Sequence, residues 1–144
     1  MTVGIVGLGL IGGSFAKAYH EAGATVLAWN RSRSVLDFAI MSGAVDAELT
    51  EDNIAACDLV LIALYPEATI EWFRRMAPHI GAHPVVLDCG GTKRTICAAC
   101  FPIAKEHGVT FLGGHPMAGT QYSGFKNAKA TMYHGAPMVI VPPD

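Results

Sequence analysis

The sequence predicts an α/β fold, with a doubly wound, mostly parallel sheet and helices on both faces. Three observations lead to this prediction. Short apolar runs alternate with helical stretches along the 144 residues, which is the pattern of repeated βαβ units. The apolar runs are rich in Val, Leu and Ile without polar alternation, as in strands buried on both faces. A glycine-rich turn joins the first apolar run directly to a helical stretch.

The expected elements follow one another closely. Strands are predicted at residues 3–6, 25–29, 59–64, 85–88, 110–112 and 138–141. Helices are predicted at residues 10–21, 34–41, 51–56, 68–76 and 95–107. Most of the helices are followed by a glycine that can adopt the left-handed conformation of a helix C-terminus, namely Gly23, Gly43, Gly81 and Gly108.

Composition narrows the class of protein. The length fits one domain, and the chain is 51% hydrophobic with only 15% charged residues. No apolar run reaches the ~20 residues of a membrane helix, and no basic segment precedes the first run, so a signal peptide is not predicted. A net charge of −2 without a basic stripe argues against a nucleic-acid partner.

The first turn carries the most informative motif. Gly7-x-Gly9-x-x-Gly12 follows the first predicted strand and opens the first helix. This is the Rossmann arrangement, in which glycines permit a tight turn, a close approach to a pyrophosphate and helix–strand packing, and the helix N-terminus faces the anion. We therefore expect Gly7, Gly9, Leu10, Ile11 and Gly12 to bind a dinucleotide. The alternative is a glycine-rich turn that binds no ligand.

The end of the second strand bears on the cofactor. Asn30 stands where an NAD-binding domain places an acidic residue on the ribose. Arg31 follows and can grip a 2′-phosphate, with donors also from Ser32, Arg33 and Ser34. NADP is therefore favoured and NAD is the alternative cofactor, in which case Arg31 stacks on the adenine and Arg33 is solvated.

The loops after the next two strands lie at the same predicted edge of the sheet. We expect cofactor contacts from both loops, involving Leu64, Tyr65, Pro66, Thr69, Cys89, Gly90 and Gly91. Lys93 is a candidate for binding an anionic group, or else a surface lysine. His115 lies in a predicted glycine-flanked loop at this edge, followed by Pro116 and Met117, which we also expect at the cofactor. Histidine suits proton transfer near neutral pH.

The cysteines do not complete a metal site. Cys97-x-x-Cys100 could be half a zinc site or a redox pair. No second pair accompanies it, and i, i+3 residues share one helix face. We therefore expect two buried thiols, and reduced thiols point to the cytoplasm.

The chain resembles the prephenate dehydrogenase family, which includes arogenate dehydrogenases. The resemblance is carried by three segments, at residues 7–14, 88–93 (Asp-Cys-Gly-Gly-Thr-Lys) and 114–119 (Gly-His-Pro-Met-Ala-Gly). It implies oxidative decarboxylation of prephenate to 4-hydroxyphenylpyruvate in tyrosine biosynthesis, with arogenate as the alternative substrate. The family's histidine maps onto His115, which would take the proton of the ring hydroxyl.

The resemblance also marks departures. Many members have serine at the position of Gly91, so Thr92 is a candidate to replace its hydroxyl, and many have glutamate at the position of Gln121. The family continues into a helical dimerisation domain, so residues 1–144 are expected to be its dinucleotide-binding half, which binds cofactor but turns over substrate poorly. The alternatives are a β-hydroxyacid dehydrogenase or imine reductase, and a nucleotide-sensing module.

Overall fold

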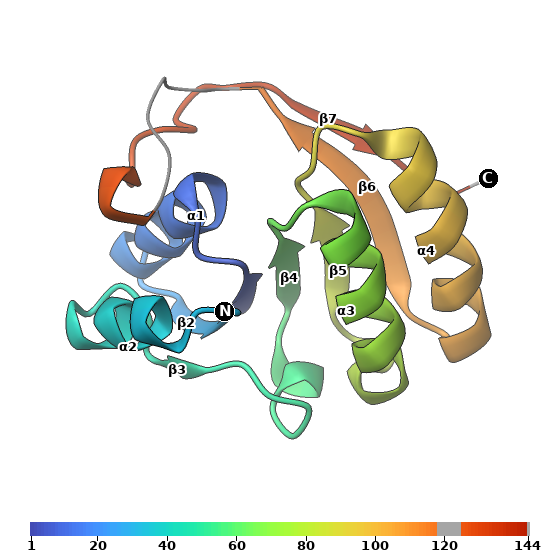
Figure 1. Ribbon diagram of the computed structural model, residues 1–144, viewed down its shortest axis with the longest axis horizontal. Coiled ribbons are helices and arrows are strands. Elements are labelled where there is room, and N and C mark those ends of the chain that lie inside the picture. Colours follow the sequence, from blue (N-terminus) through green and yellow to red (C-terminus); the bar gives the residue numbers. More distant parts are fainter. Residues whose placement is uncertain (118–124, 144) are drawn as a thin grey trace.

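The computed structural model describes residues 1–117 and 125–143, and Figure 1 shows their arrangement as a sheet between two layers of helices. The strands are β1 (Thr2–Val6), β2 (Thr25–Trp29), β3 (Ala47–Glu48), β4 (Leu59–Ile62), β5 (Val85–Asp88), β6 (Thr110–Pro116) and β7 (Met138–Val141). The helices are α1 (Leu10–Glu21), α2 (Arg33–Met41), α3 (Pro66–Ile80) and α4 (Lys93–His107), with 3₁₀ turns η1 (Ile54–Ala56) and η2 (Phe125–Asn127).

Within the described residues the strands form one sheet in the order β3-β2-β1-β4-β5-β6-β7. All neighbouring pairs from β3 to β6 are parallel, and β7 pairs with β6 in the antiparallel direction. The strand order reverses at β1, because the chain moves outward to β2 and β3 and then crosses back to β4. Ligands of such sheets bind outside the carboxyl ends of the strands at this point of reversal.

Each face of the sheet has its own core. Residues of α1 and α2, such as Ala16 and Leu36, pack with Ile5 on one face. Residues of α3 and α4, such as Phe73 and Ile96, pack on the other face. The buried residues of α3 recur three and four positions apart, so this helix turns one apolar side to the sheet. The predicted doubly wound α/β fold is therefore confirmed.

Several predicted boundaries were wrong. The strands predicted at 25–29, 85–88 and 138–141 match β2, β5 and β7. In contrast, β4 ends at Ile62 rather than at residue 64, and β6 runs on to Pro116 instead of ending at residue 112. The helix predicted at 68–76 is longer at both ends, as α3. The predicted helix at 51–56 is only the 3₁₀ turn η1, and β3 was not predicted. The four glycines expected after helices all have positive φ, and both Cys97 and Cys100 are buried as expected.

Residues 125–136 lie against α1, and the chain then returns along the upper edge of Figure 1 to β7. The Nζ of Lys17 donates to the carbonyl oxygen of Ala128 at 2.8 Å, and the amide of Lys129 donates to Ser14 Oγ at 3.1 Å. Gly13 permits this packing, because a Cβ there would lie 2.7 Å from the Phe125 ring. Residues 125–136 thus cover part of the surface of α1.

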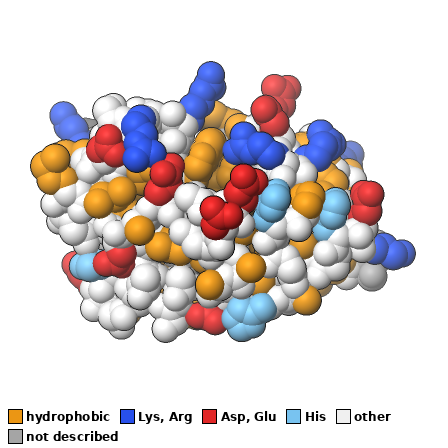
Figure 2. All heavy atoms as spheres, turned by 90° about the horizontal axis from the view of Figure 1, so that it is seen from below, with side chains coloured by type: hydrophobic (Ala, Val, Ile, Leu, Met, Phe, Trp, Pro, Cys, Tyr) orange, Lys and Arg blue, Asp and Glu red, His pale blue; other side chains and the backbone are white. Residues whose placement is uncertain are grey.

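No helix in the described part of the chain is both long and apolar enough to span a membrane. Figure 2 shows the face seen from below, where acidic, basic and histidine side chains are intermixed. Charges of both signs on this face leave no single-sign stripe of the kind that follows a nucleic-acid backbone.

Candidate functional site

The predicted site residues within the described part of the chain lie in the turns after β1, β2, β4, β5 and β6 or at the ends of those strands. Because these strands are parallel, their carboxyl ends meet at one edge of the sheet. Sequence positions as far apart as Gly9 and His115 are thereby brought to the same edge. The fold thus gathers at one edge the residues that were expected to bind cofactor and substrate.

The glycine turn after β1 has the shape that its motif predicts. Gly7 has a φ of +94°, and a Cβ there would lie 2.4 Å from the carbonyl oxygen of Ala63. A Cβ on Gly12 would lie 1.7 Å from the carbonyl oxygen of Gly7, whereas a Cβ on Gly9 would meet no atom within 4 Å. Gly7 and Gly12 are therefore required by the fold itself, and Gly9 faces open space in front of α1. Leu10 and Ile11 form the first turn of α1, whose backbone N–H groups have no partner within the helix.

Asn30 ties the loop after β2 to the glycine turn. Its side-chain oxygen accepts from the amide of Leu8 at 2.9 Å, and its side-chain nitrogen donates to the carbonyl oxygen of Ser32 at 3.1 Å. Sequence reasoning placed Asn30 at the cofactor but did not foresee this tie. Aspartate at this position could accept from Leu8 as well, so the tie alone does not explain the neutral residue.

Arg31 lines a cavity of about 340 Å³ between the end of β2 and α3. Trp29, Leu64, Glu71 and Arg75 also line it, and the Arg75 guanidinium lies 5.6 Å from the centre of the Trp29 ring. The cavity therefore combines aromatic surface with two cationic side chains, of which Arg31 is exposed.

The donors expected next to Arg31 are already engaged within the protein. Arg33 pairs with Glu48 at 2.8 Å and with Asp37 at 3.2 Å. The hydroxyls of Ser32 and Ser34 lie 3.1 Å apart and share a hydrogen bond. The expectation that Arg33 is a further phosphate donor is thus not supported, because its charge is balanced by two carboxylates.

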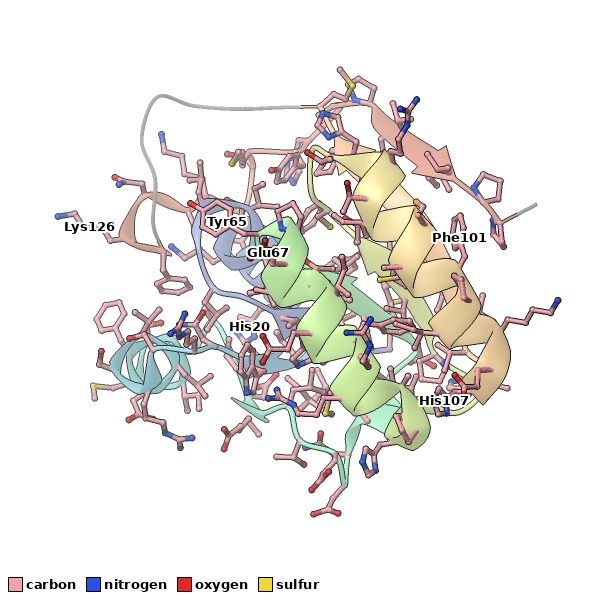
Figure 3. The ribbon with its side chains drawn as sticks, turned by 45° about the vertical axis from the view of Figure 1, so that its right-hand side comes forward. His20, Tyr65, Glu67, Phe101, His107 and Lys126 are labelled. Atoms are coloured by element: carbon pink, nitrogen blue, oxygen red, sulfur yellow. The ribbon has the colours of Figure 1, made fainter. Side chains whose placement is uncertain are left out.

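The loop between β4 and α3 divides into exposed and buried residues. Tyr65 is 88% exposed at the amino end of α3, beside Glu67 in Figure 3, and Pro66 is the first residue of the helix. Thr69 is fully buried, and its hydroxyl donates to the carbonyl oxygen of Leu64 at 3.2 Å. Thr69 therefore shapes the loop from within, while Leu64 and Tyr65 present surface to a ligand.

The end of β5 contains a buried carboxylate that sequence reasoning missed as part of the site. Asp88 has no exposed surface and forms an ion pair with Lys93, and it also accepts hydrogen bonds from the amides of Gly90, at 2.9 Å, and Gly114, at 3.3 Å. Lys93, a candidate anion ligand, is thus bound to Asp88. The signal in the sequence was a lone carboxylate closing an apolar strand, with a lysine five residues later.

His115 lies in β6 and not in a loop, because Gly114 and His115 pair with Ile140 and Val139 of β7. Its Nδ1 lies 3.3 Å from the carbonyl oxygen of Gly90. Because a carbonyl oxygen can only accept, this contact is a hydrogen bond when Nδ1 carries a proton, and in the neutral ring Nε2 is then the acceptor. A Cβ on Gly91 would lie 3.4 Å from Cε1 of His115, so Gly91 borders the ring without covering it.

The remaining predicted residues differ in their exposure. Thr92 is exposed before α4, and its side chain forms no capping hydrogen bond. No hydrogen bond joins Thr92 to His115 in the described structure, so the proposed replacement of a serine hydroxyl is not supported by contact.

Cys89 is buried, which raises the pKa of its thiol to about 12. Pro116 is buried and Met117 is half exposed, and the Met117 amide donates to the carbonyl oxygen of Pro137 at 2.8 Å. Gly119 and Gln121 lie outside the described residues.

A comparison with family models matches residues 15–144 to "Prephenate dehydrogenase, nucleotide-binding domain". Among curated proteins, the chain is 29% identical over 146 aligned residues to a prephenate dehydrogenase of Bacillus subtilis, covering 98% of this chain and 39% of that protein.

Solved structures agree. An arogenate dehydrogenase of Synechocystis superposes with a TM-score of 0.90 at 26% identity, covering 100% of this chain and 51% of that one. A prephenate dehydrogenase of A. aeolicus, solved in complex with hydroxyphenyl propionate and NAD+, superposes with a TM-score of 0.78 at 25% identity, covering 100% of this chain and 51% of that one. The chain therefore spans about two fifths to one half of the proteins that it matches.

Proposed function

The chain belongs to the prephenate dehydrogenase family, as its nucleotide-binding domain, and from this we propose that it binds a nicotinamide dinucleotide and positions it for oxidative decarboxylation of prephenate. The product would be 4-hydroxyphenylpyruvate, on the route to tyrosine. Arogenate is the alternative substrate. The observation that carries the proposal is the meeting of the glycine turn and His115 at one edge of the sheet.

The glycine turn fits a dinucleotide. The open space at Gly9 leaves the backbone uncovered in front of α1, where free N–H groups and the helix dipole favour a pyrophosphate. The cavity at Trp29 and Arg31 is suited to the adenosine end, since it offers aromatic surface and cationic groups. Bound NAD+ or NADP+ would accept the hydride from the substrate ring.

His115 is proposed as the base. With the proton on Nδ1 and held by Gly90, Nε2 can accept the hydrogen bond of the ring hydroxyl and then its proton. As the hydroxyl carbon loses its hydride and becomes a carbonyl carbon, the carboxylate on the ring would leave as CO₂, and the electron pair of the broken C–C bond would make the ring aromatic with a phenolate oxygen. His115 would then return the proton to this oxygen, so the protein's residues are required to orient the substrate and to hold one proton.

NADP is the proposed cofactor, in preference to NAD. Asn30 carries no charge to repel a 2′-phosphate, and Arg31 is exposed at the cavity without a carboxylate within ion-pair distance among the described residues. Arg33 is excluded from this role by Glu48 and Asp37. The specificity would then rest on Arg31, with Arg75 also lining the cavity.

Titration of the chain with NADPH and then NADH, followed by nicotinamide fluorescence, tests this proposal. We expect tighter binding of NADPH and, in Arg31→Ala, a loss of about tenfold for NADPH alone, the worth of a charge-assisted hydrogen bond. Arg74→Ala removes an exposed arginine of α3 and serves as the matched control. Preference for NADH would overturn the choice of NADP, and binding of neither would contradict the cofactor site.

The alternatives are separated by His115→Asn in the longer protein. A base at this position predicts that turnover falls by about 10²- to 10⁴-fold while cofactor affinity is kept. A change in affinity without loss of turnover would instead favour a nucleotide sensor. A β-hydroxyacid dehydrogenase or imine reductase would retain its chemistry, because its catalytic lysine lies elsewhere.

We further propose that residues 1–144 act as one cofactor-binding domain whose substrate site is completed by a helical domain, with the longer protein a homodimer in the cytoplasm. The buried free thiols support a reducing compartment. The chain alone is then expected to bind cofactor with little turnover. Robust prephenate-dependent formation of NADPH by these residues would contradict this division.

A further inference from the structure

Asp88 is the last residue of β5, and its carboxylate is fully buried at the edge of the sheet where the proposed site lies. Its Oδ1 faces the ammonium of Lys93 and the amide of Gly114, at 3.3 Å, and its Oδ2 accepts from the amide of Gly90 at 2.9 Å. A buried carboxylate is retained in a fold when such donors satisfy it. Asp88 therefore holds two separate backbone segments and one helix together.

Both of these backbone segments lead to His115. Gly114 is its neighbour in the chain, so its amide fixes the end of β6 that carries the histidine. Gly90 supplies the carbonyl oxygen that accepts from Nδ1 of His115 at 3.3 Å. One carboxylate thus holds the backbone from which the ring projects and the amide of Gly90, the residue whose carbonyl oxygen faces the ring.

The backbone is crowded around the carboxylate at both glycines. A Cβ on Gly114 would lie 2.6 Å from the carbonyl oxygen of Asp88, and a Cβ on Gly90 would lie 3.2 Å from Asp88 Oδ2. The two glycines therefore let the backbone come close to the carboxylate. Lys93, with an 18% exposed side chain, balances the charge from the first turn of α4.

We propose that Asp88, paired with Lys93, is a positioning residue that sets the tautomer of His115 through Gly90, whose N–H is held by the carboxylate and whose C=O, on the other side of its Cα, faces the ring. The orientation of Gly90 keeps the proton on Nδ1, and this leaves Nε2 as the acceptor that a general base needs. The inference rests on the proposed role of His115 as the base. It also separates Asp88 from a residue that serves stability alone, since such a residue would leave the tautomer unchanged.

The tautomer can be read directly from nitrogen chemical shifts. Multiple-bond ¹H–¹⁵N spectra of the ¹⁵N-labelled chain distinguish the protonated from the unprotonated ring nitrogen, and His115→Asn assigns the signals of His115. In the native chain at alkaline pH we expect Nδ1 to be the protonated nitrogen. A native chain in which His115 is mainly protonated on Nε2 would overturn the proposal without any variant.

Asp88→Asn is expected to abolish the preference for Nδ1–H, because the Gly90 amide is no longer held by a carboxylate and the backbone that directs the Gly90 carbonyl oxygen is released. The matched control is Asp58→Asn, which removes a different carboxylate that contacts a histidine, His83, at 2.8 Å and should leave the His115 signals unchanged. If Asp88→Asn does not fold, the charge-neutral pair Asp88→Asn with Lys93→Met replaces it, since no charge is then buried alone. A folded variant with an unchanged His115 tautomer would overturn the proposal. The spectra need no turnover, so their result is independent of whether His115→Asn supports the proposed function.

Discussion

Gly9 and Gly12 belong to the same turn, yet their hydrogen atoms face very different surroundings. A Cβ on Gly12 would lie 1.7 Å from the carbonyl oxygen of Gly7, and a Cβ on Gly9 would meet nothing within 4 Å. Gly9 also has an ordinary φ of −78°. The motif therefore contains two glycines that the fold requires, Gly7 and Gly12, and one, Gly9, that only a ligand would require.

Alanine substitutions separate these two requirements. We expect Gly12→Ala to lower the free energy of unfolding by about 3 kcal/mol, because backbone must move to admit the methyl group. Gly9→Ala should cost less than about 1 kcal/mol, the difference between glycine and alanine before a helix, but should lose most of its affinity for NADPH. Urea denaturation and fluorescence titration measure the two effects.

Gly23→Ala provides a comparison for stability alone, since Gly23 has a positive φ and lies at the far end of α1. It should lose stability without a change in the affinity of the folded protein. Full NADPH affinity in Gly9→Ala would contradict the placement of a pyrophosphate in front of α1.

At the scale of residues, the sequence predicted what a local motif encodes. The glycine turn is such a motif, because its three glycines act within one strand–turn–helix unit. Asp88 could not be assigned a role in this way, since its partner Gly114 is 26 residues away and is reached only through pairing of β5 with β6. The same holds for Asn30, whose bond to Leu8 spans 22 residues.

Among the elements, β6 shows why a boundary was missed. The predicted strand ends at residue 112, before two consecutive glycines. In the structure β6 continues to Pro116, because β7 pairs with it. Side chains at these positions would collide with neighbours, since a Cβ on Gly113 would lie 2.8 Å from the sulfur of Cys97. The glycines reflect crowding, and His115 stands on a paired strand and not on a loop.

The short elements differ from the prediction for another reason, since β3 was not predicted and η1 was predicted as a longer helix. β3 has two residues and η1 has three, which is too few for a hydrophobic period to appear. Their positions depend on tertiary contacts instead. The amide of Leu49, directly after β3, donates to the carbonyl oxygen of Ala28 in β2 at 2.7 Å.

The amino ends of three strands are joined by one carboxylate. Asp58, before β4, accepts from the amide of Thr2 in β1 at 2.8 Å and contacts His83, before β5, at 2.8 Å. The hydrogen bonds from Thr2 and His83 hold the pKa of Asp58 below its ordinary value of 3.8. The folded state therefore binds the Asp58 proton less readily than the unfolded state does.

This depressed pKa predicts a pH dependence of stability. The contribution of Asp58 is present in full above the pKa of the unfolded chain, near 4, and is lost as pH falls through the lower pKa of the folded state. The difference in urea midpoint between the native chain and Asp58→Asn should therefore be constant near neutral pH and shrink below about pH 4. Asp52→Asn, an exposed carboxylate of the same connection, is the control. A difference that grows with acidity would contradict the assignment.

Across the whole molecule, the two edges of the sheet differ. β3 forms one edge with two residues, and Glu48 within it pairs with Arg33. β7 forms the other edge with four apolar residues, among which Val139 is 47% exposed and Ile140 is 53% exposed. A short edge that carries charge resists pairing with another strand, whereas an apolar edge invites it.

We accordingly expect the 144-residue chain to self-associate through β7. Its elution volume in size-exclusion chromatography should fall as concentration rises, and Ile140→Lys should suppress this shift by placing a charge on the open edge. Arg74→Ala, which removes an exposed charge on α3, is the control substitution. Monomeric elution over a wide range of concentrations would contradict the prediction.

The unequal edges also decide how far any such assembly can grow. Two copies that meet at β7 across a two-fold axis each use their single open edge, so the contact is self-complementary and the assembly closes as a pair. A filament would need a second adhesive edge, and β3 does not provide one. The short, charged strand β3 thus limits such an assembly to a finite particle, although the contact itself is made at β7.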